Sequence, residues 1–142
     1  MKKANFLTIS LCVLTFSTPL AADSDQRVLV ELPAPMKNHM LANMRQHLVI
    51  IDQLLLLLGE DRLDAASALA EAELGMSSLG KHGASHIAPF YPEGMREAGT
   101  SMHRAASRFA LVAQEGDPRA AYRALQEVTA ACNRCHAGYR VH

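Results

Sequence analysis

The chain has 142 residues, with 14 basic and 14 acidic side chains and no net charge. Balanced charge without a basic stripe argues against a nucleic-acid partner. Trp is absent and only 4 Phe and 3 Tyr occur, a composition that favours packed helices over a β-sandwich, because strands are enriched in aromatic residues.

The N-terminal stretch has the layout of a secretory signal peptide. Lys2 and Lys3 precede an apolar segment over residues 4–16, and small residues end at Ala22. We expect cleavage after Ala22, export to the periplasm and a single mature domain over residues 23–142. Cys12 leaves with the signal, and the mature chain keeps 12 basic and 14 acidic residues, a net charge of −2.

A polar, Pro-ended lead-in over residues 23–34 precedes the first predicted helix, residues 36–58, which Gly59 closes. Two apolar stripes could form its buried seam. One stripe is Met40, Met44, Ile51, Leu54 and Leu58, and the other is Leu41, Met44, Leu48, Ile51, Leu55 and Leu58. The apolar run 48–58 is too short to span a membrane and contains Asp52 and Gln53, so we expect a buried helix and no membrane-spanning segment.

Three more helices follow. The second starts near Asp61 or Asp64 as a cap and runs to about residue 79. A loop over residues 80–92 leads to the third helix, residues 93–114. The fourth has Asp117 as its cap and Pro118 at its first position, with Leu125, Val128, Cys132, Cys135 and Tyr139 on one seam. Four amphipathic helices with mostly short links predict an all-α, antiparallel four-helix bundle.

The most specific signal is the C-x-x-C-H pattern formed by Cys132, Cys135 and His136. On a helix, these three side chains lie on one side of a turn. Two thiols can bond the vinyl groups of a haem while the imidazole binds its iron, so the motif predicts one covalently bound haem c. A thioredoxin-like site would need a β-α-β pattern, and a zinc site would need further ligands; the sequence indicates neither.

The motif C-x-x-C-H-x-x-Y-R on a final helix, after a signal peptide and three other helices, resembles the cytochrome c′ family. Residues 59–64 also resemble that family's link between its first two helices. The resemblance implies that Arg140 is the basic residue near the proximal ligand His136. Arg140 also lies four residues after His136, which would place both on one helical face, and it could instead stabilise the negative end of the helix. Residues 76–95, rich in Gly, depart from the family pattern.

An antiparallel bundle places His136 opposite the first turns of helix one. That interval offers Met36, His39, Met40, Asn43, Met44 and His47. The resemblance puts the distal residue about four turns before the second helix, which favours Met44, 15 residues before Gly59, with Asn43 in the gapless register. Met44 is therefore the expected second iron ligand beside His136; Met40, a His or an open position remain alternatives, and Met44 could simply fill the core.

Smaller expectations concern the remaining polar residues. His82, His86 and His103 could form a second metal site with Met76, Met95 and Met102, although ordinary loop and surface roles are favoured because their spacing fits no ligand pattern. Tyr139 is expected to pack against the haem edge or a neighbouring helix. Arg104, Arg108, Arg119 and Arg123 are expected on solvated helix faces.

Two functions are consistent with these features. The favoured one is a periplasmic electron carrier, whose axial Met would raise the reduction potential of the haem. The alternative is a five-coordinate haem protein that binds small gases such as nitric oxide or carbon monoxide. No nucleophile–base or carboxylate pair indicates an enzyme. Redox proteins are the expected partners, and a homodimer could form through helix one.

Overall fold

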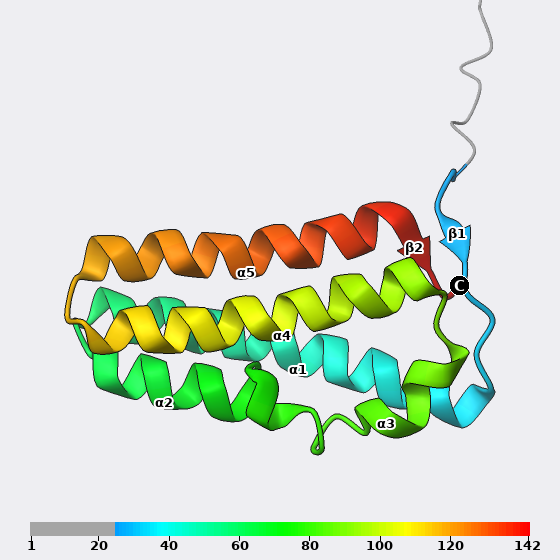
Figure 1. Cartoon of the computed structure of the whole chain (residues 1–142), viewed down its shortest axis with the longest axis horizontal. Coiled ribbons are helices and arrows are strands. Elements are labelled where there is room, and N and C mark those ends of the chain that lie inside the picture. Colours follow the sequence, from blue (N-terminus) through cyan, green and yellow to red (C-terminus); the bar gives the residue numbers. More distant parts are fainter. Residues whose placement is uncertain (1–24) are drawn as a thin grey trace, which may run out of the picture.

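The computed structural model describes residues 25–142, which form a bundle of four long helices (Figure 1). These are α1 (Ala34–Gly59), α2 (Leu63–Glu73), α4 (Glu93–Gln114) and α5 (Pro118–Gly138). Successive long helices run in opposite directions, so the α1–α2 and α4–α5 links lie at one end of the bundle and the C-terminus at the other. The predicted all-α bundle is confirmed. The predicted signal peptide lies outside the described residues.

The third long helix agrees with its predicted bounds. The fourth begins as predicted but ends at Gly138, so the predicted seam residue Tyr139 lies beyond the helix. Asp117 caps α5: its Oδ1 accepts hydrogen bonds from the backbone N–H groups of Arg119, at 2.9 Å, and Ala120, at 3.3 Å. Pro118 occupies the first turn, where its missing N–H leaves no helical hydrogen bond unmade. Local sequence signals therefore predict α4 and the start of α5.

The second helix is shorter than predicted. Instead of reaching residue 79, α2 ends at Glu73, because the N–H groups of Leu74 and Gly75 both bond the Ala70 carbonyl, each at 2.8 Å, and Gly75 then adopts an extended conformation. Neither predicted cap acts as one, since Arg62 is the N-cap residue and no side chain bonds there.

The predicted loop over residues 80–92 contains regular structure. A 3₁₀ turn, η1 (Met76–Ser78), follows α2; then come the short helix α3 (Ala84–Ile87) and a second 3₁₀ turn, η2 (Ala88–Phe90). Gly83 allows the turn into α3 by adopting a φ of +62°, which favours glycine. Residues 74–92 thereby form a compact segment over one side of the bundle, here called the cover (Figure 1).

Only one face of α1 is buried. Met40, Ile50, Leu54 and Leu58 point into the protein, which agrees in part with the first predicted stripe. The second stripe is wrong, because Leu48 is 72 % and Leu55 49 % exposed. The apolar composition of α1 on all sides gave no basis for choosing between the stripes.

By length and composition, α1 is the one helix in the described part of the chain that could cross a membrane. Its buried side chains nevertheless belong to the bundle core, where Leu54 and Leu58 pack with Phe109 of α4 and Val128 of α5. A helix that supplies core residues to a bundle is occupied on that face and presents only its outer face to the surroundings.

A two-stranded parallel sheet closes the C-terminal end of the bundle, where no strand is predicted from the sequence. Strand β1 (Val28–Leu29) pairs with β2 (Tyr139–Arg140). The Val30 N–H extends the pairing with a 2.8 Å bond to the Arg140 carbonyl. A second apolar cluster lies beneath the sheet, formed by Val30, Met40, Ile87, Met95 and Val141.

Candidate functional site

The attachment motif lies on the last turns of α5, at the end of the bundle closed by the sheet. Cys132 is half-buried against the main core and Cys135 against the second cluster, whereas His136 is exposed. Burial raises the pKa of both thiols, and the neighbouring Cys132 raises that of Cys135 further. The motif therefore lies at the boundary between the packed core and an unfilled space.

That space is a hollow of about 230 Å³, here called the C-terminal hollow. Helix α5 supplies Cys135 and His136 to its wall, and α1 supplies Met40 and Met44. The remaining wall residues are Arg27, Leu41, Tyr91, Met95, Gly99, Tyr139, Arg140, Val141 and His142. The structure therefore brings Met44 and Met40 to the same hollow as His136, as the bundle topology predicted.

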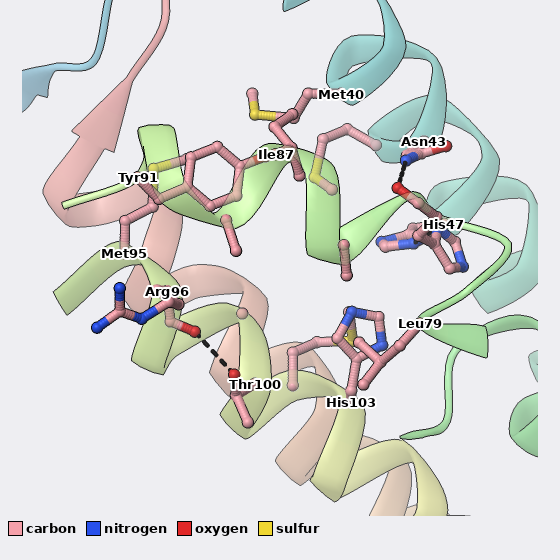
Figure 2. A pocket seen from close by; sticks show the side chains of 16 residues that line it. Met40, Asn43, His47, Leu79, Ile87, Tyr91, Met95, Arg96, Thr100 and His103 are labelled. Carbon is pink, nitrogen blue, oxygen red and sulfur yellow. Dashed lines mark hydrogen bonds between the residues drawn. The ribbon is translucent and has the colours of Figure 1, made fainter. Parts of the chain in front are cut away.

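A second hollow, of about 140 Å³, adjoins the first and is here called the histidine hollow. Figure 2 shows Tyr91 and Met95 at one end of it and His47, Leu79 and His103 at the other. The two hollows share five wall residues, Met40, Met44, Tyr91, Met95 and Gly99. They are therefore neighbouring compartments of one largely apolar space between α1, α4 and the cover.

The other candidates on the first turns of α1 have polar partners in the cover. Nε2 of His39 lies 3.0 Å from the His82 carbonyl oxygen, and the Asn43 amide donates to the same oxygen at 3.3 Å, as Figure 2 shows for Asn43. His47 bonds the His82 ring. These contacts give His39, Asn43 and His47 a structural role in holding the cover against α1.

Arg140 lies elsewhere than predicted. It belongs to β2 rather than to α5, so it does not share a helical face with His136. Its Nε lies 3.3 Å from Oδ2 of Asp25, but this buried nitrogen has no aligned hydrogen-bond partner among the described residues. Arg27 also holds Asp25, at 2.7 Å, and the hydrogen bonds from Arg27 keep the Asp25 pKa well below its usual value. Arg140 thus has one buried donor without an aligned partner, and the residue lines the C-terminal hollow.

Tyr139 packs against α4, one of the two predicted outcomes. Its hydroxyl lies directly over Gly94, where a β-carbon would collide with it. Tyr139 also lines the C-terminal hollow.

The histidines divide differently from the prediction. His86 is exposed, whereas His82 and His103 are buried, so a surface position is wrong for those two, although His82 does lie in a turn. His47 joins them from α1, with its ring centroid 4.8 Å from that of His82. Burial lowers the His47 pKa to about 4, helped by the His82 and His103 charges. Burial also lowers the His103 pKa, against the opposing effect of the Leu74 carbonyl. Sequence reasoning missed this trio because its members are far apart in the chain.

The predicted solvated arginines are confirmed. Arg104 and Arg108 of α4, and Arg119 and Arg123 of α5, are all exposed.

Residues 90–140 match the family model described as Cytochrome C′. This segment of the chain is similar to the cytochrome c′ family. It contains α4, α5 and the attachment motif, which are the elements that form the C-terminal hollow on one side. No curated protein and no solved structure matches the chain. The predicted resemblance to cytochrome c′ is thus confirmed over its most specific part.

Cytochrome c′ proteins carry covalently bound haem c, and the residues here suit that group. Two thiols and an imidazole occur at attachment spacing, and the adjoining hollows are largely apolar. The unsatisfied Nε of Arg140 would suit a haem propionate, because a carboxylate accepts charge-assisted hydrogen bonds from a guanidinium. These features support a c-type cytochrome.

Proposed function

We propose that this chain is a periplasmic electron carrier rather than an enzyme. Cys132 and Cys135 would hold one haem c covalently and His136 would be an axial ligand. A bound haem c would supply an iron centre that changes its oxidation state. The observation that carries the proposal is that thioethers of α1 share a hollow with His136, which makes a second, sulfur ligand available.

Met44 is the proposed second ligand. Both Met44 and Met40 line the hollow, but Met40 is 8 % exposed and is part of the second apolar cluster. Met44 is half-buried and belongs to neither cluster core. A thioether that is not already used in packing can turn toward a ligand at a lower cost, since Met has three rotatable bonds.

Gas binding is the second candidate, and Gly99 favours it. This residue of α4 lines both hollows, and a β-carbon built on it would meet nothing within 4 Å. Open space beside an apolar wall could admit a small diatomic such as nitric oxide or carbon monoxide. That reading requires the methionines to remain packing residues.

The absorption spectrum of the holoprotein tests the choice. With Met44 as a ligand, ferric and ferrous forms are expected to be low-spin and to bind carbon monoxide slowly. Met44→Ala should give a high-spin form that binds the gas readily. Met40→Ala is the control, expected to cost about 2–5 kcal/mol of stability by leaving a cavity, without changing the spin state. A wild-type protein that is already high-spin and quick to bind carbon monoxide would establish the gas-binding candidate instead.

The proposal includes export and partners. Loss of residues 1–22 would place the mature chain in the periplasm, where redox proteins would exchange electrons with it.

The outer face of α1 carries exposed apolar side chains. Among them Leu48 and Leu55 are seven residues apart and form a seam on this face. We infer that this seam pairs with the same seam of a second copy, because two like helices can interlock residues at this spacing.

A further inference from the structure

Three imidazoles from distant parts of the chain meet at one end of the histidine hollow. His47 comes from α1, His82 from the turn after η1, and His103 from α4. Their ring centroids are 4.8 Å apart for His47 and His82, 5.6 Å for His82 and His103, and 6.2 Å for His47 and His103. His82 and His103 are only 8 % and 9 % exposed. These three buried or half-buried imidazoles lie outside the attachment motif, and the proposed haem function does not use them.

Two neighbouring carbonyl groups fix the protons of two of these rings. Nε2 of His82 lies 2.9 Å from the Glu73 oxygen, and Nδ1 of His103 lies 2.8 Å from the Leu74 oxygen. A carbonyl oxygen can only accept, so each of these nitrogens donates a hydrogen. In the neutral rings, Nδ1 of His82 and Nε2 of His103 then carry the lone pairs. Metal-binding histidines are commonly oriented in this way by a carbonyl group behind the ring.

The first pair already has the spacing of metal ligands. Nε2 of His47 and Nδ1 of His82 are 3.3 Å apart. Two nitrogens that bind one tetrahedral ion at about 2.0–2.1 Å lie about 3.3 Å from each other, and the centroids of their rings lie about 5 Å apart. An ion between these nitrogens would replace the hydrogen that they now share.

The third ring would have to approach the other two. No group of three His, Cys, Asp or Glu side chains within residues 25–142 is already placed to hold an ion. The centroid distances from His103, 5.6 and 6.2 Å, exceed the ligand spacing by about 0.6 and 1.2 Å. A rotation of the His103 side chain toward the other two rings would remove this difference, and all three histidines line the histidine hollow.

We propose that His47, His82 and His103 form a binding site for one divalent transition-metal ion, of the kind represented by Zn²⁺. Imidazole nitrogens suit Zn²⁺ and Cu²⁺, whereas Mg²⁺ and Ca²⁺ prefer oxygen ligands. The three histidines leave a fourth position facing the histidine hollow, open to water or a small ligand. This site is separate from the attachment motif and does not depend on the proposed haem function.

Direct binding of Zn²⁺ to the untagged holoprotein, freed of metal with a chelator, tests the proposal. Equilibrium dialysis followed by elemental analysis is expected to find one Zn²⁺ per chain in addition to iron, and no Mg²⁺ under the same conditions. His103→Gln should weaken Zn²⁺ binding by at least about tenfold, because it removes one of three ligands. His86→Gln, at an exposed histidine outside the cluster, should leave it unchanged.

His47→Gln provides a second variant, since His47 is the least buried member and its replacement is the least disruptive to folding. It should also weaken Zn²⁺ binding by at least about tenfold, with an unchanged haem spectrum. The proposal is overturned if the wild-type protein binds no Zn²⁺, or if His47→Gln and His103→Gln bind it as tightly as the wild type. In either case the trio serves only to hold the cover by hydrogen bonds. Haem content, measured in the same samples, reports separately on the proposed function.

Discussion

The hydroxyl of Tyr139 rests on Gly94, the second residue of α4, and leaves no space there for a side chain. This contact joins the C-terminal strand to the start of α4 at the wall of the C-terminal hollow. Glycine is therefore required at position 94 for packing, although its backbone is ordinary helix.

Gly94→Ala is expected to destabilise the protein by about 1–3 kcal/mol, because the added methyl group forces Tyr139 or α4 to move. Gly59→Ala is the matched control. A β-carbon at this last residue of α1 meets nothing within 4 Å, so the higher helix propensity of Ala should make the change neutral or stabilising by up to about 1 kcal/mol. Urea unfolding measures both. Equal effects of the two substitutions would show that the Tyr139 contact is unimportant.

His136→Ala tests the proposal that His136 binds the haem iron. Both thioether bonds should remain, so the intact mass should still equal the mature chain plus one haem, and acid-acetone should leave the colour with the polypeptide. The spin state and reduction potential should change, because the axial imidazole has been lost. An unchanged spectrum would show that another residue binds the iron on that side.

His47 should make the metal-free protein less stable in acid. Its pKa is about 4 in the folded protein against its usual 6.5, so the unfolded chain binds more protons between these values. The contribution to stability is therefore full above pH 6.5 and is lost as the pH falls toward 4. For this partly exposed ring we expect a loss of about 1–2 kcal/mol.

Thermal or urea unfolding in the presence of EDTA, at several pH values, measures this dependence. His47→Gln should flatten the curve between pH 6.5 and 4, while His86→Gln should leave it as in the wild type. A slope that His47→Gln does not change would mean that other groups control the acid stability.

The outer seam of α1 makes a prediction about assembly. Leu48→Glu combined with Leu55→Glu should convert a dimer into monomers, because charged side chains would be buried at the pairing seam. Leu111→Glu, on α4, is the control, since Leu111 is 64 % exposed and lies outside the seam. Sedimentation velocity distinguishes the species. A wild-type monomer, or a dimer that survives the double substitution, would contradict pairing through α1.

Local signals in the sequence determined most of the helices. Asp117 and Pro118 mark the start of α5, and the bounds of α4 follow from Pro92 and Gly116 on either side. Capping and ring geometry act within one turn of helix, so neighbouring residues suffice to predict them. The spacing of Cys132, Cys135 and His136 is equally local, and it indicated the resemblance to cytochrome c′ that the match over residues 90–140 bears out.

Tertiary structure alone decided which side of α1 is buried, where α2 ends and what Arg140 contacts. Leu48 and Leu54 are equally apolar, but only the second faces α4 and α5. Tertiary structure also brings the three histidines together. His47 and His82 are 35 residues apart in the chain, and they meet only because the cover packs against α1 and α4. Sequence periodicity describes one helix at a time, whereas these contacts depend on how separate segments pack together in space.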